Sequence, residues 1–178
     1  LVPFAEAGFR AISIQPSDVW ALEAQGMSAR EIAARVADAG LVITEVDCTA
    51  CWMERQTRVE HVGGLAEFLR QLTPEPIIAT AARIGAQSVS AIDLSVVPAS
   101  LDEQAEGFAR LCAMAADHGL KAQIEFLPTG GIRSLGEAMA VVEAAGCGNG
   151  GVTLDAWHFY RSGSTLEELA RVPGHRIH

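Results

Sequence analysis

The chain has 178 residues, of which 49% are hydrophobic and 20% are charged, and this balance indicates a folded globular protein rather than a disordered one. Its 13 Lys and Arg residues against 22 Asp and Glu residues give a net charge of -9, which argues against nucleic acid as a partner. The sequence shows neither an apolar run of the roughly 20 residues that a membrane helix needs nor a signal peptide, so we expect a cytoplasmic protein without a membrane partner.

Short apolar runs of strand length alternate along the chain with longer helical patterns. In chain order, strands are predicted at 11–14, 41–46, 88–94, 121–127 and 151–154, with 176–178 as the opening of a sixth. Helical patterns lie between them at 28–39, 65–72, 76–84, 100–118, 134–145 and 165–170. Strands joined by helices in this way run parallel, because each crossover brings the chain back in the same direction.

The ends of the helical patterns carry recognisable caps. Four Ser-x-x-Glu pairs fit the capping box, in which the hydroxyl and the carboxylate each accept a free backbone N–H bond, and these pairs begin at Ser28, Ser100, Ser134 and Ser164. Glycines that suit a left-handed turn follow four of the helical patterns, at Gly40, Gly85, Gly119 and Gly146. The caps therefore support the alternation of helices and strands.

Two parallel architectures fit this alternation, the closed (β/α)8 barrel and the open doubly wound sheet. Strands of an open sheet tend to be apolar throughout, whereas polar residues recur here at every second position, as with Gln123 and Glu125 on either side of Ile124. The first strand is also not followed by Gly-x-Gly-x-x-Gly. We therefore predict an α/β protein with a parallel (β/α)8 TIM barrel. Because a complete barrel takes about 250 residues, we expect 1–178 to be a single domain, truncated at both ends and containing about strands 2 to 7.

The cysteines give no clear sign of metal or redox chemistry. They are Cys48, Cys51, Cys112 and Cys147. A redox Cys-x-x-C needs its first sulfur at a helix N-terminus and a structural zinc site needs a second ligand pair, and the sequence shows neither. Buried or half-buried free thiols are the favoured interpretation.

Polar residues gather at the carboxyl ends of the predicted strands, where parallel barrels place their sites. They are Gln15, Glu45, Asp47, Asp93, Glu125 and Asp155. A ring of carboxylates with no matching Lys indicates a divalent cation. We predict that Gln15 and Glu45 bind substrate at this rim.

Glu125 is the strongest single candidate, because an ionised carboxylate between Ile124 and Phe126 on a buried strand needs a partner. That partner is either a metal ion, which we favour, or an arginine such as Arg133. The metal interpretation gains support from the acid that ends the next strand, Asp155.

Asp155 is followed three residues later by His158, and two interpretations are open for this pair. The aspartate either caps the following turn or binds a metal together with Glu125, with the imidazole pointing toward the metal or a substrate. Arg161 either holds a substrate oxyanion or bridges a rim carboxylate.

Two further features allow a ligand-binding and a structural interpretation. The segment PTGG at 128–131, just before Ser134, resembles a phosphate cradle, but such turns are also glycine-rich for steric reasons, which we favour. Tryptophan side chains either form apolar walls for a ligand or pack in the core, at Trp20, Trp52 and Trp157.

Two blocks of sequence resemble the fifth and sixth strand and helix units of the xylose isomerase-like TIM barrels. They are KAQIEFLPTGGIRSLGEAMAVVEAAG and GGVTLDAWHFYRSGSTLEELARVPGHRI, and AGFRAISIQPSDVWAL resembles the second unit. The resemblance implies a divalent metal, often Mn, Mg, Co or Zn, with Glu125 and Asp155 among its ligands. It also implies that His158 lies beside metal and substrate, that Arg161 falls where related barrels carry an arginine, and that a His and a Glu ligand come after His178.

This family includes sugar phosphate isomerases and epimerases, inosose dehydratases, hydroxypyruvate isomerases and the endonuclease IV group. The leading hypothesis is a metal-dependent isomerase or epimerase acting on a sugar, sugar phosphate or polyol, with Glu125 and His158 as catalytic residues and His158 and Arg161 in contact with substrate. A lyase of the inosose or dehydroshikimate type and a metal-free ligand-binding barrel are the alternatives. Phosphodiester cleavage is disfavoured by the net charge of -9. The expected partner is a small molecule, and a homo-oligomer is possible.

Overall fold

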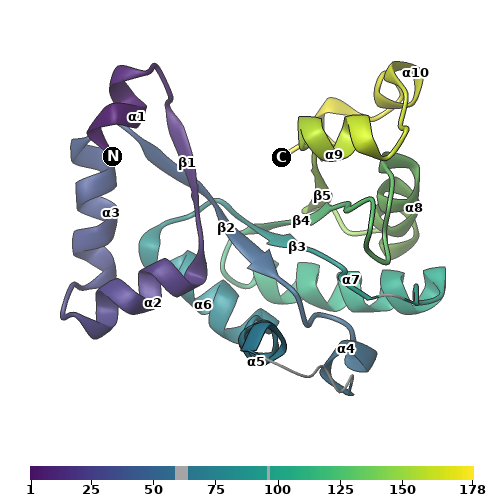
Figure 1. The fold of residues 1–178 in the computed structure, drawn as a ribbon, viewed down its shortest axis with the longest axis horizontal. Helices are drawn as coiled ribbons and strands as arrows, with labels where there is room; N and C mark the ends of the chain where they lie inside the picture. The colour runs from purple at the N-terminus through teal and green to yellow at the C-terminus, as the bar shows by residue number, and fades with distance from the viewer. Residues whose placement is uncertain (59–63, 96) are drawn as a thin grey trace.

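The structure, a computed structural model, describes residues 1–58, 64–95 and 97–178, without the side chains of 57, 58 and 64–66. Within these residues, five parallel strands form one sheet in which the spatial order follows the chain order. They are β1 (Ala11–Ile14), β2 (Val42–Thr49), β3 (Ser88–Ala91), β4 (Lys121–Glu125) and β5 (Gly150–Thr153). The sheet is curved, as Figure 1 shows. The predicted parallel α/β architecture is confirmed.

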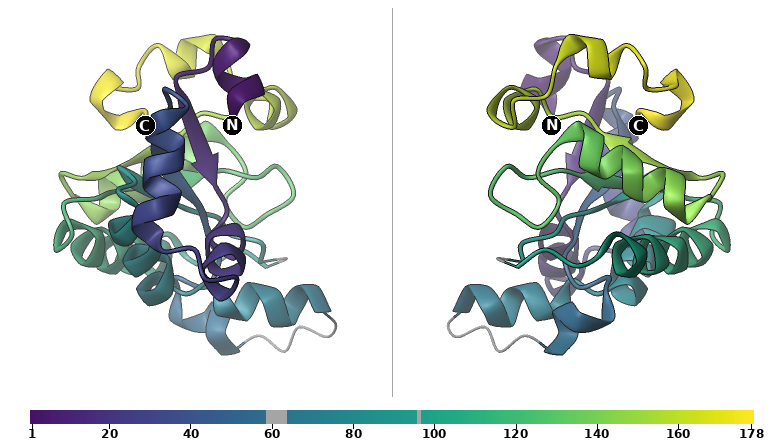
Figure 2. Two further views of the ribbon diagram at one scale, coloured as in Figure 1. Left: turned by 90° about the vertical axis from the view of Figure 1, so that its left-hand side faces the viewer. Right: turned by 90° about the vertical axis from the view of Figure 1, so that its right-hand side faces the viewer.

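Helices precede, connect and follow the strands, and several of them cover one side of the sheet. They are α1 (Val2–Glu6), α2 (Pro16–Ala24), α3 (Ala29–Asp38), α4 (Glu54–Arg58), α5 (Gly64–Gln71), α6 (Pro74–Ile84), α7 (Leu101–Ala116), α8 (Leu135–Ala145), α9 (Ala156–Arg161) and α10 (Leu166–Leu169). Helix α3 packs on α6, α6 on α7 and α7 on α8, so these helices form a continuous outer layer. Figure 2 views this layer from its two ends, with α3 in front on the left and α8 in front on the right.

The observed boundaries correct the predicted ones at several points. Strand β2 continues to Thr49, whereas β3 and β4 end earlier than expected. The predicted sixth strand is reduced to a single parallel bridge between Val152 and Ile177, because a 3-10 helix takes up Gly174–Arg176. The short helix α9 was not expected, and it begins directly after Asp155.

The predicted caps are confirmed at most helices. A complete capping box joins Ser28 and Glu31, and the hydroxyls of Ser100 and Ser134 each accept the predicted backbone N–H bond. The box predicted at Ser164 is wrong, because the box is formed one residue later by Thr165 and Glu168. The four predicted glycines all adopt the left-handed conformation, with φ of 75° at Gly40, 72° at Gly85, 69° at Gly119 and 66° at Gly146.

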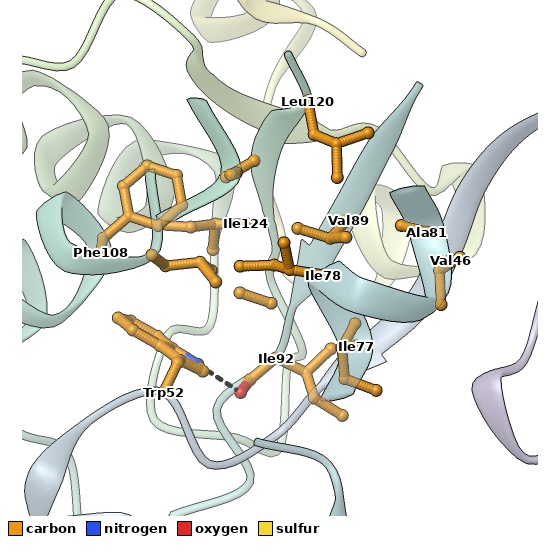
Figure 3. Close-up of a cluster of buried hydrophobic side chains, with 14 of the residues drawn as sticks. Val46, Trp52, Ile77, Ile78, Ala81, Val89, Ile92, Phe108, Leu120 and Ile124 are labelled. Carbon is orange, nitrogen blue, oxygen red and sulfur yellow. Dashed lines mark hydrogen bonds between the residues drawn. The ribbon is translucent and has the colours of Figure 1, made fainter. Parts of the chain in front are cut away.

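The main core lies between the sheet and the outer helices. Figure 3 shows side chains of β2, β3 and β4 meeting those of α6 and α7, with Val46, Val89, Ile124 and Phe108 all at 0% exposure. Trp52 closes one end of this core, where its Nε1 donates a 2.8 Å hydrogen bond to the carbonyl of Ile92. Apolar burial on this face leaves the opposite face of the strands for polar side chains.

All four cysteines are free thiols, as predicted, with Cys51 and Cys112 buried and Cys48 and Cys147 half-buried. In the described part of the chain, no helix is both long enough and apolar enough to cross a membrane.

Candidate functional site

The register of the sheet brings the predicted acids toward one rim. Glu125, the last residue of β4, pairs with Thr153, the last residue of β5, and Asp155 follows two positions later. On β2, Glu45 and Asp47 are two positions apart, so their side chains leave the same face of the strand. Strands β2 and β4 and the residue two positions after β5 therefore bring four carboxylates to one region.

Glu125 and His158 form the central pair of the site. Oε1 of Glu125 lies 3.5 Å from Nε2 of His158, and the two side chains are 18% and 21% exposed. The other ring nitrogen, Nδ1 of His158, is buried and has no hydrogen-bond partner among the described residues. Of the two ring nitrogens, Nε2 therefore has a polar partner among the described residues and Nδ1 has none.

The pKa of Glu125 is raised to about 7, mainly by burial and then by the charges of Asp47, Glu45 and Asp155. Burial disfavours the ionised form, and each neighbouring carboxylate disfavours it further. None of the described contributions to this pKa comes from a Lys or Arg. Among the described residues, the rim thus concentrates carboxylates, with His158 as the basic side chain beside Glu125.

Glu45, in the middle of β2, is held by polar neighbours. Nε2 of Gln123 donates a hydrogen bond to Oε1 of Glu45, and the Thr153 hydroxyl donates to the same oxygen over 3.4 Å. Burial raises the pKa of Glu45, and Asp47 adds to this effect while the bond from Gln123 opposes it. Glu45 is therefore part of an interior hydrogen-bond network, and its predicted contact with substrate stays a prediction.

Asp47, which the sequence placed in the ring of carboxylates, lies in the same region as Gln123 and Cys48, to which no role in the site was assigned. The Ser90 hydroxyl donates a 2.6 Å hydrogen bond to Oδ1 of Asp47. Burial raises the pKa of the Cys48 thiol to about 12, and Asp47, Glu125 and Glu45 add to the increase. The signal in the sequence that could have identified Gln123 was its period-two spacing from Glu125.

Asp155 is the N-cap of α9. Its Oδ1 accepts a 2.7 Å hydrogen bond from the backbone N–H of His158. The capping interpretation is therefore confirmed. The cap uses only Oδ1, so Oδ2 of Asp155 can still bind a metal ion. The metal-binding role of Asp155 stays a prediction.

The arginine alternative for Glu125 is wrong. Nε of Arg133 donates a 2.9 Å hydrogen bond to the carbonyl of Gly130, and the described residues contain no ion pair between Arg133 and Glu125. The chain turns back on itself after β4, and this turn directs the guanidinium toward its own loop. His158 takes the position beside Glu125 instead.

Arg161 is exposed at the end of α9 and lies over the ring of Trp157, with 5.8 Å between the guanidinium carbon and the ring centroid. Trp157 is 64% exposed and also contacts His158 edge-on, with 5.1 Å between the ring centroids. Among the described residues, Arg161 forms no ion pair with a rim carboxylate. Gln15, exposed at the N-cap of α2, makes no side-chain hydrogen bond to another described residue.

The PTGG segment has a steric explanation. A Cβ added at Gly130 would lie 2.1 Å from the carbonyl oxygen of Asp93, and one added at Gly131 would lie 2.1 Å from Oδ2 of Asp93. Asp93 is 1% exposed, and its carbonyl accepts a 2.9 Å bond from the Gly131 N–H. A buried carboxylate at this position opposes the binding of phosphate, and the steric interpretation is the one that the contacts support.

Within the described ranges, no group of three His, Cys, Asp or Glu side chains has the arrangement of a metal site. Glu125, His158 and Asp155 lie together, but their present positions do not by themselves enclose a cation. A metal at this rim would need further ligands.

The sequence profile of the family described as "Xylose isomerase-like TIM barrel" matches residues 3–178. The match covers nearly the whole chain, so the protein belongs to this family. The five parallel strands are accordingly a portion of a (β/α)8 barrel, which confirms the predicted fold class.

Individual relatives match either a short part of the chain or the whole fold at low sequence identity. The chain is 35% identical over 63 residues to an inosose isomerase of Halalkalibacterium halodurans, a stretch that covers 34% of this chain and 22% of that protein. Its fold is similar to a crystal structure of the IOLI protein with a zinc atom, with a TM-score of 0.78 at 18% identity over 98% of this chain and 63% of that one.

A second solved structure of similar fold is the probable 3-DHS dehydratase AsbF of Bacillus anthracis, involved in petrobactin synthesis. Its TM-score is 0.66 at 17% identity over 96% of this chain and 62% of that one. The chain therefore spans less than two thirds of the length of these three proteins.

Proposed function

We propose that the protein is a metal-dependent isomerase or epimerase that acts on a sugar, sugar phosphate or polyol. The observation that carries the proposal is the convergence of four carboxylates, which raises the pKa of Glu125 to about 7 through burial and through Asp47, Glu45 and Asp155. Buried carboxylates of like charge remain close together when protons or a cation neutralise them. The partial identity to an inosose isomerase and the zinc atom in the IOLI structure support the same interpretation.

The donor atoms at this rim suit a divalent cation, namely Mn, Mg, Co or Zn. Glu125 and Asp155 would each supply a carboxylate oxygen, which is the ligand that Mg and Mn prefer and that Zn also accepts. We propose that the remaining ligands come from strands after His178, in a single barrel domain that extends beyond residues 1–178, as the greater length of the relatives suggests.

A bound cation would polarise neighbouring oxygens of a ketose and so make the adjacent C–H group more acidic. Glu125 would then accept this proton on its carboxylate, which is the general base that the rim offers beside the substrate. His158, 3.5 Å away, would orient the Glu125 carboxylate and contact a substrate hydroxyl. Arg161, Gln15 and Glu45 are the further candidates for contact with substrate.

The proposal is tested with Glu125→Gln and Asp155→Asn in the complete protein. Both variants are expected to lose the binding of Mn and Zn, measured by calorimetry, together with the interconversion of ketose substrates. Glu143→Gln is a suitable control, because this glutamate is exposed on α8 away from the rim. Turnover that persists in metal-stripped protein would contradict the proposal.

A dehydratase acting on an inosose or on a dehydroshikimate-like acid is the second candidate, and the similarity to the fold of AsbF favours it. The same cation and the same base would serve, but the product would be an enone or an aromatic acid. An increase in ultraviolet absorbance on these substrates would identify the dehydratase. Ligand binding without any metal in elemental analysis would instead identify a non-catalytic barrel.

A further inference from the structure

A network of buried polar groups links the three loops that follow β2, β3 and β4. Its centre is Asp93, which comes two residues after β3 and is 1% exposed. Oδ1 of Asp93 accepts a 3.1 Å hydrogen bond from Nε2 of Gln56 on α4 and a 2.9 Å bond from the backbone N–H of Ser95. The carbonyl of Asp93 accepts the 2.9 Å bond from the Gly131 N–H. The network thus joins loops at the carboxyl ends of the strands, where parallel barrels carry their sites.

Gln56 is itself held from the other side. It is 5% exposed, and its Oε1 accepts hydrogen bonds from the backbone N–H groups of Trp52, over 2.9 Å, and Met53, over 2.8 Å. The Trp52 ring donates in turn to the carbonyl of Ile92, the residue before Asp93 (Figure 3). Because two N–H groups require the amide oxygen of Gln56 at this position, its amide nitrogen must face Asp93.

The network reaches the candidate site through the loop after β4. Gly131 lies in this loop, which is closed by a 2.9 Å hydrogen bond from the Leu127 N–H to the carbonyl of Ile132. Leu127 is two residues after Glu125, and Ile132 is 1% exposed. Gly131 and Ile132 are adjacent in the chain. A displacement of Asp93 would therefore be transmitted to the backbone directly after Glu125.

Stability alone does not account for a carboxyl group at the centre of this network. Oδ2 of Asp93 is buried, and it has no hydrogen-bond partner among the described residues. The described part of the chain also contains no ion pair between Asp93 and a basic side chain. A buried polar group that is only partly satisfied is less favourable than an apolar side chain of similar size. Such a cost is typical of residues that a protein keeps for the sake of its site.

We propose that Gln56 and Asp93 are positioning residues, which hold the loop after β4 so that Glu125 faces His158. Neither residue would contact a substrate or a cation. Their effect passes along the backbone from Gly131 to Glu125 and sets the 3.5 Å distance between Oε1 of Glu125 and Nε2 of His158. The consequence for metal binding rests on the proposed function, whereas the positioning itself does not.

Two variants address the bond between Gln56 and Asp93. In Gln56→Glu the new carboxylate keeps an oxygen for the Trp52 and Met53 N–H groups, but it has no proton to donate to Asp93. The double variant Gln56→Glu, Asp93→Asn supplies a donor again, because the asparagine amide can donate to the new carboxylate. This exchange gives up the bond from the Ser95 N–H, so a partial recovery is expected.

Thr80→Val is the matched control for a general loss of stability. Thr80 is 0% exposed on α6, and its Oγ1 accepts a 2.9 Å hydrogen bond from Nε1 of Trp20 on α2. The variant therefore also loses a buried side-chain hydrogen bond, but in the outer layer of helices and outside the network.

The first measurement is NMR of the complete protein in EDTA at one fixed pH, which follows the backbone amides of Gly131 and Leu127 and the ring nitrogens of His158. In Gln56→Glu all of these resonances are expected to shift, since Nε2 of His158 responds to the position of the Glu125 carboxylate. They should return toward the parent values in the double variant and stay unchanged in Thr80→Val. Shifts that stop at Gly131 without reaching Leu127 and His158 would overturn the proposal.

The second measurement is calorimetric titration with Mn. Gln56→Glu is expected to bind Mn about tenfold more weakly than the parent, as is typical when the support of a metal ligand is disturbed. The double variant should recover part of this loss, and Thr80→Val should bind as the parent does. Unchanged affinity in Gln56→Glu would overturn the proposal. A parent protein that binds no Mn would contradict the proposed function, while NMR of the metal-free protein would still decide the role of Gln56 and Asp93.

Discussion

Nε2 of His158 lies 3.5 Å from Oε1 of Glu125, although a complete helix and strand separate the two residues in the chain. Glu125 is the last residue of β4, and His158 is in the first turn of the helix that follows β5. Because β4 and β5 are parallel neighbours, their carboxyl ends bring the two side chains to the same rim. The pair depends on the order of the strands and not on local sequence.

The metal-free protein is predicted to lose stability as the pH rises, because of Glu125. Its pKa in the folded state is about 7, above the ordinary value of 4.5, so between these values the folded state keeps a proton that the unfolded state has lost. The contribution of this group to the free energy of unfolding is therefore full below about pH 4.5 and is lost as the pH rises through about 7, by at most about 3 kcal/mol.

Urea unfolding in EDTA at about pH 5 and about pH 8 measures this loss. In Glu125→Gln the difference between the two pH values is expected to shrink, because the group that titrates has been removed. Glu45, whose pKa is also raised by burial, leaves a residual difference of the same sign. An unchanged pH dependence in the variant would assign the effect to other groups.

Two substitutions of Asp155 are predicted to separate its capping role from its proposed role as a metal ligand. Asp155→Asn keeps an oxygen that can accept the His158 N–H bond, so its stability should stay close to that of the parent while metal binding is lost. Asp155→Ala removes the cap as well and should lower the free energy of unfolding by about 1 kcal/mol.

Ser134→Ala serves as a control, since it removes the cap of a different helix, α8, and should leave metal binding intact. Denaturant unfolding and metal titration of the three variants provide the comparison. Metal binding by Asp155→Asn at full affinity would restrict Asp155 to the capping role.

Two glycines that lie five residues apart, Gly131 and Gly136, are predicted to respond in opposite ways to alanine. In Gly131→Ala the new Cβ would lie 2.1 Å from Oδ2 of buried Asp93, so unfolding should become easier by more than about 2 kcal/mol. In Gly136→Ala, at an exposed position of α8, the nearest atom is 3.8 Å away, and the variant should gain about 0.5–1 kcal/mol. Thermal unfolding measures both, and a tolerated Gly131→Ala would show that Asp93 can move.

Alanine substitutions at two tryptophans are predicted to affect different properties, the free energy of unfolding for one and ligand binding for the other. Trp52 is 4% exposed and bonded to Ile92, so Trp52→Ala should destabilise the fold by roughly 3–5 kcal/mol. Trp157 is 64% exposed, and Trp157→Ala should change stability by less than about 0.5 kcal/mol. Because Trp157 contacts both Arg161 and His158, its loss should weaken the binding of a sugar or polyol, as ligand titration would reveal. Equal affinity in the parent and the variant would argue against a ligand at this face.

Periodicity and caps were sufficient to predict the alternation of strands and helices. The capping residues of α3 and α8 and the glycines that follow them, Gly40 and Gly146, mark the elements on either side. The end of β2 was missed because Asp47 interrupts its apolar pattern. The structure keeps Asp47 in the strand because Ser90 on β3 donates a hydrogen bond to its carboxylate, and this partner is distant in the sequence.

The sequence was sufficient to predict which acids form the candidate site, but not which side chains they contact. The choice between Arg133 and another partner for Glu125 could not be made from the sequence, since it depends on how the loop after β4 folds back onto Gly130. Helix α9 was missed because it has only six residues, too few to show an apolar periodicity. Its presence determines the direction of His158.

The capping role of Asp155 restricts which amino acids can occupy the N-cap position of α9. Ser, Thr, Asn and Asp all begin helices well, but Asp is the one among them that also carries a negative charge. Glutamate keeps the charge, but its extra methylene displaces the oxygen that Asp155 offers to the His158 N–H. Relatives that change their preference for a substrate or a cation are therefore expected to vary at other rim positions, such as that of Asp47, while retaining aspartate here.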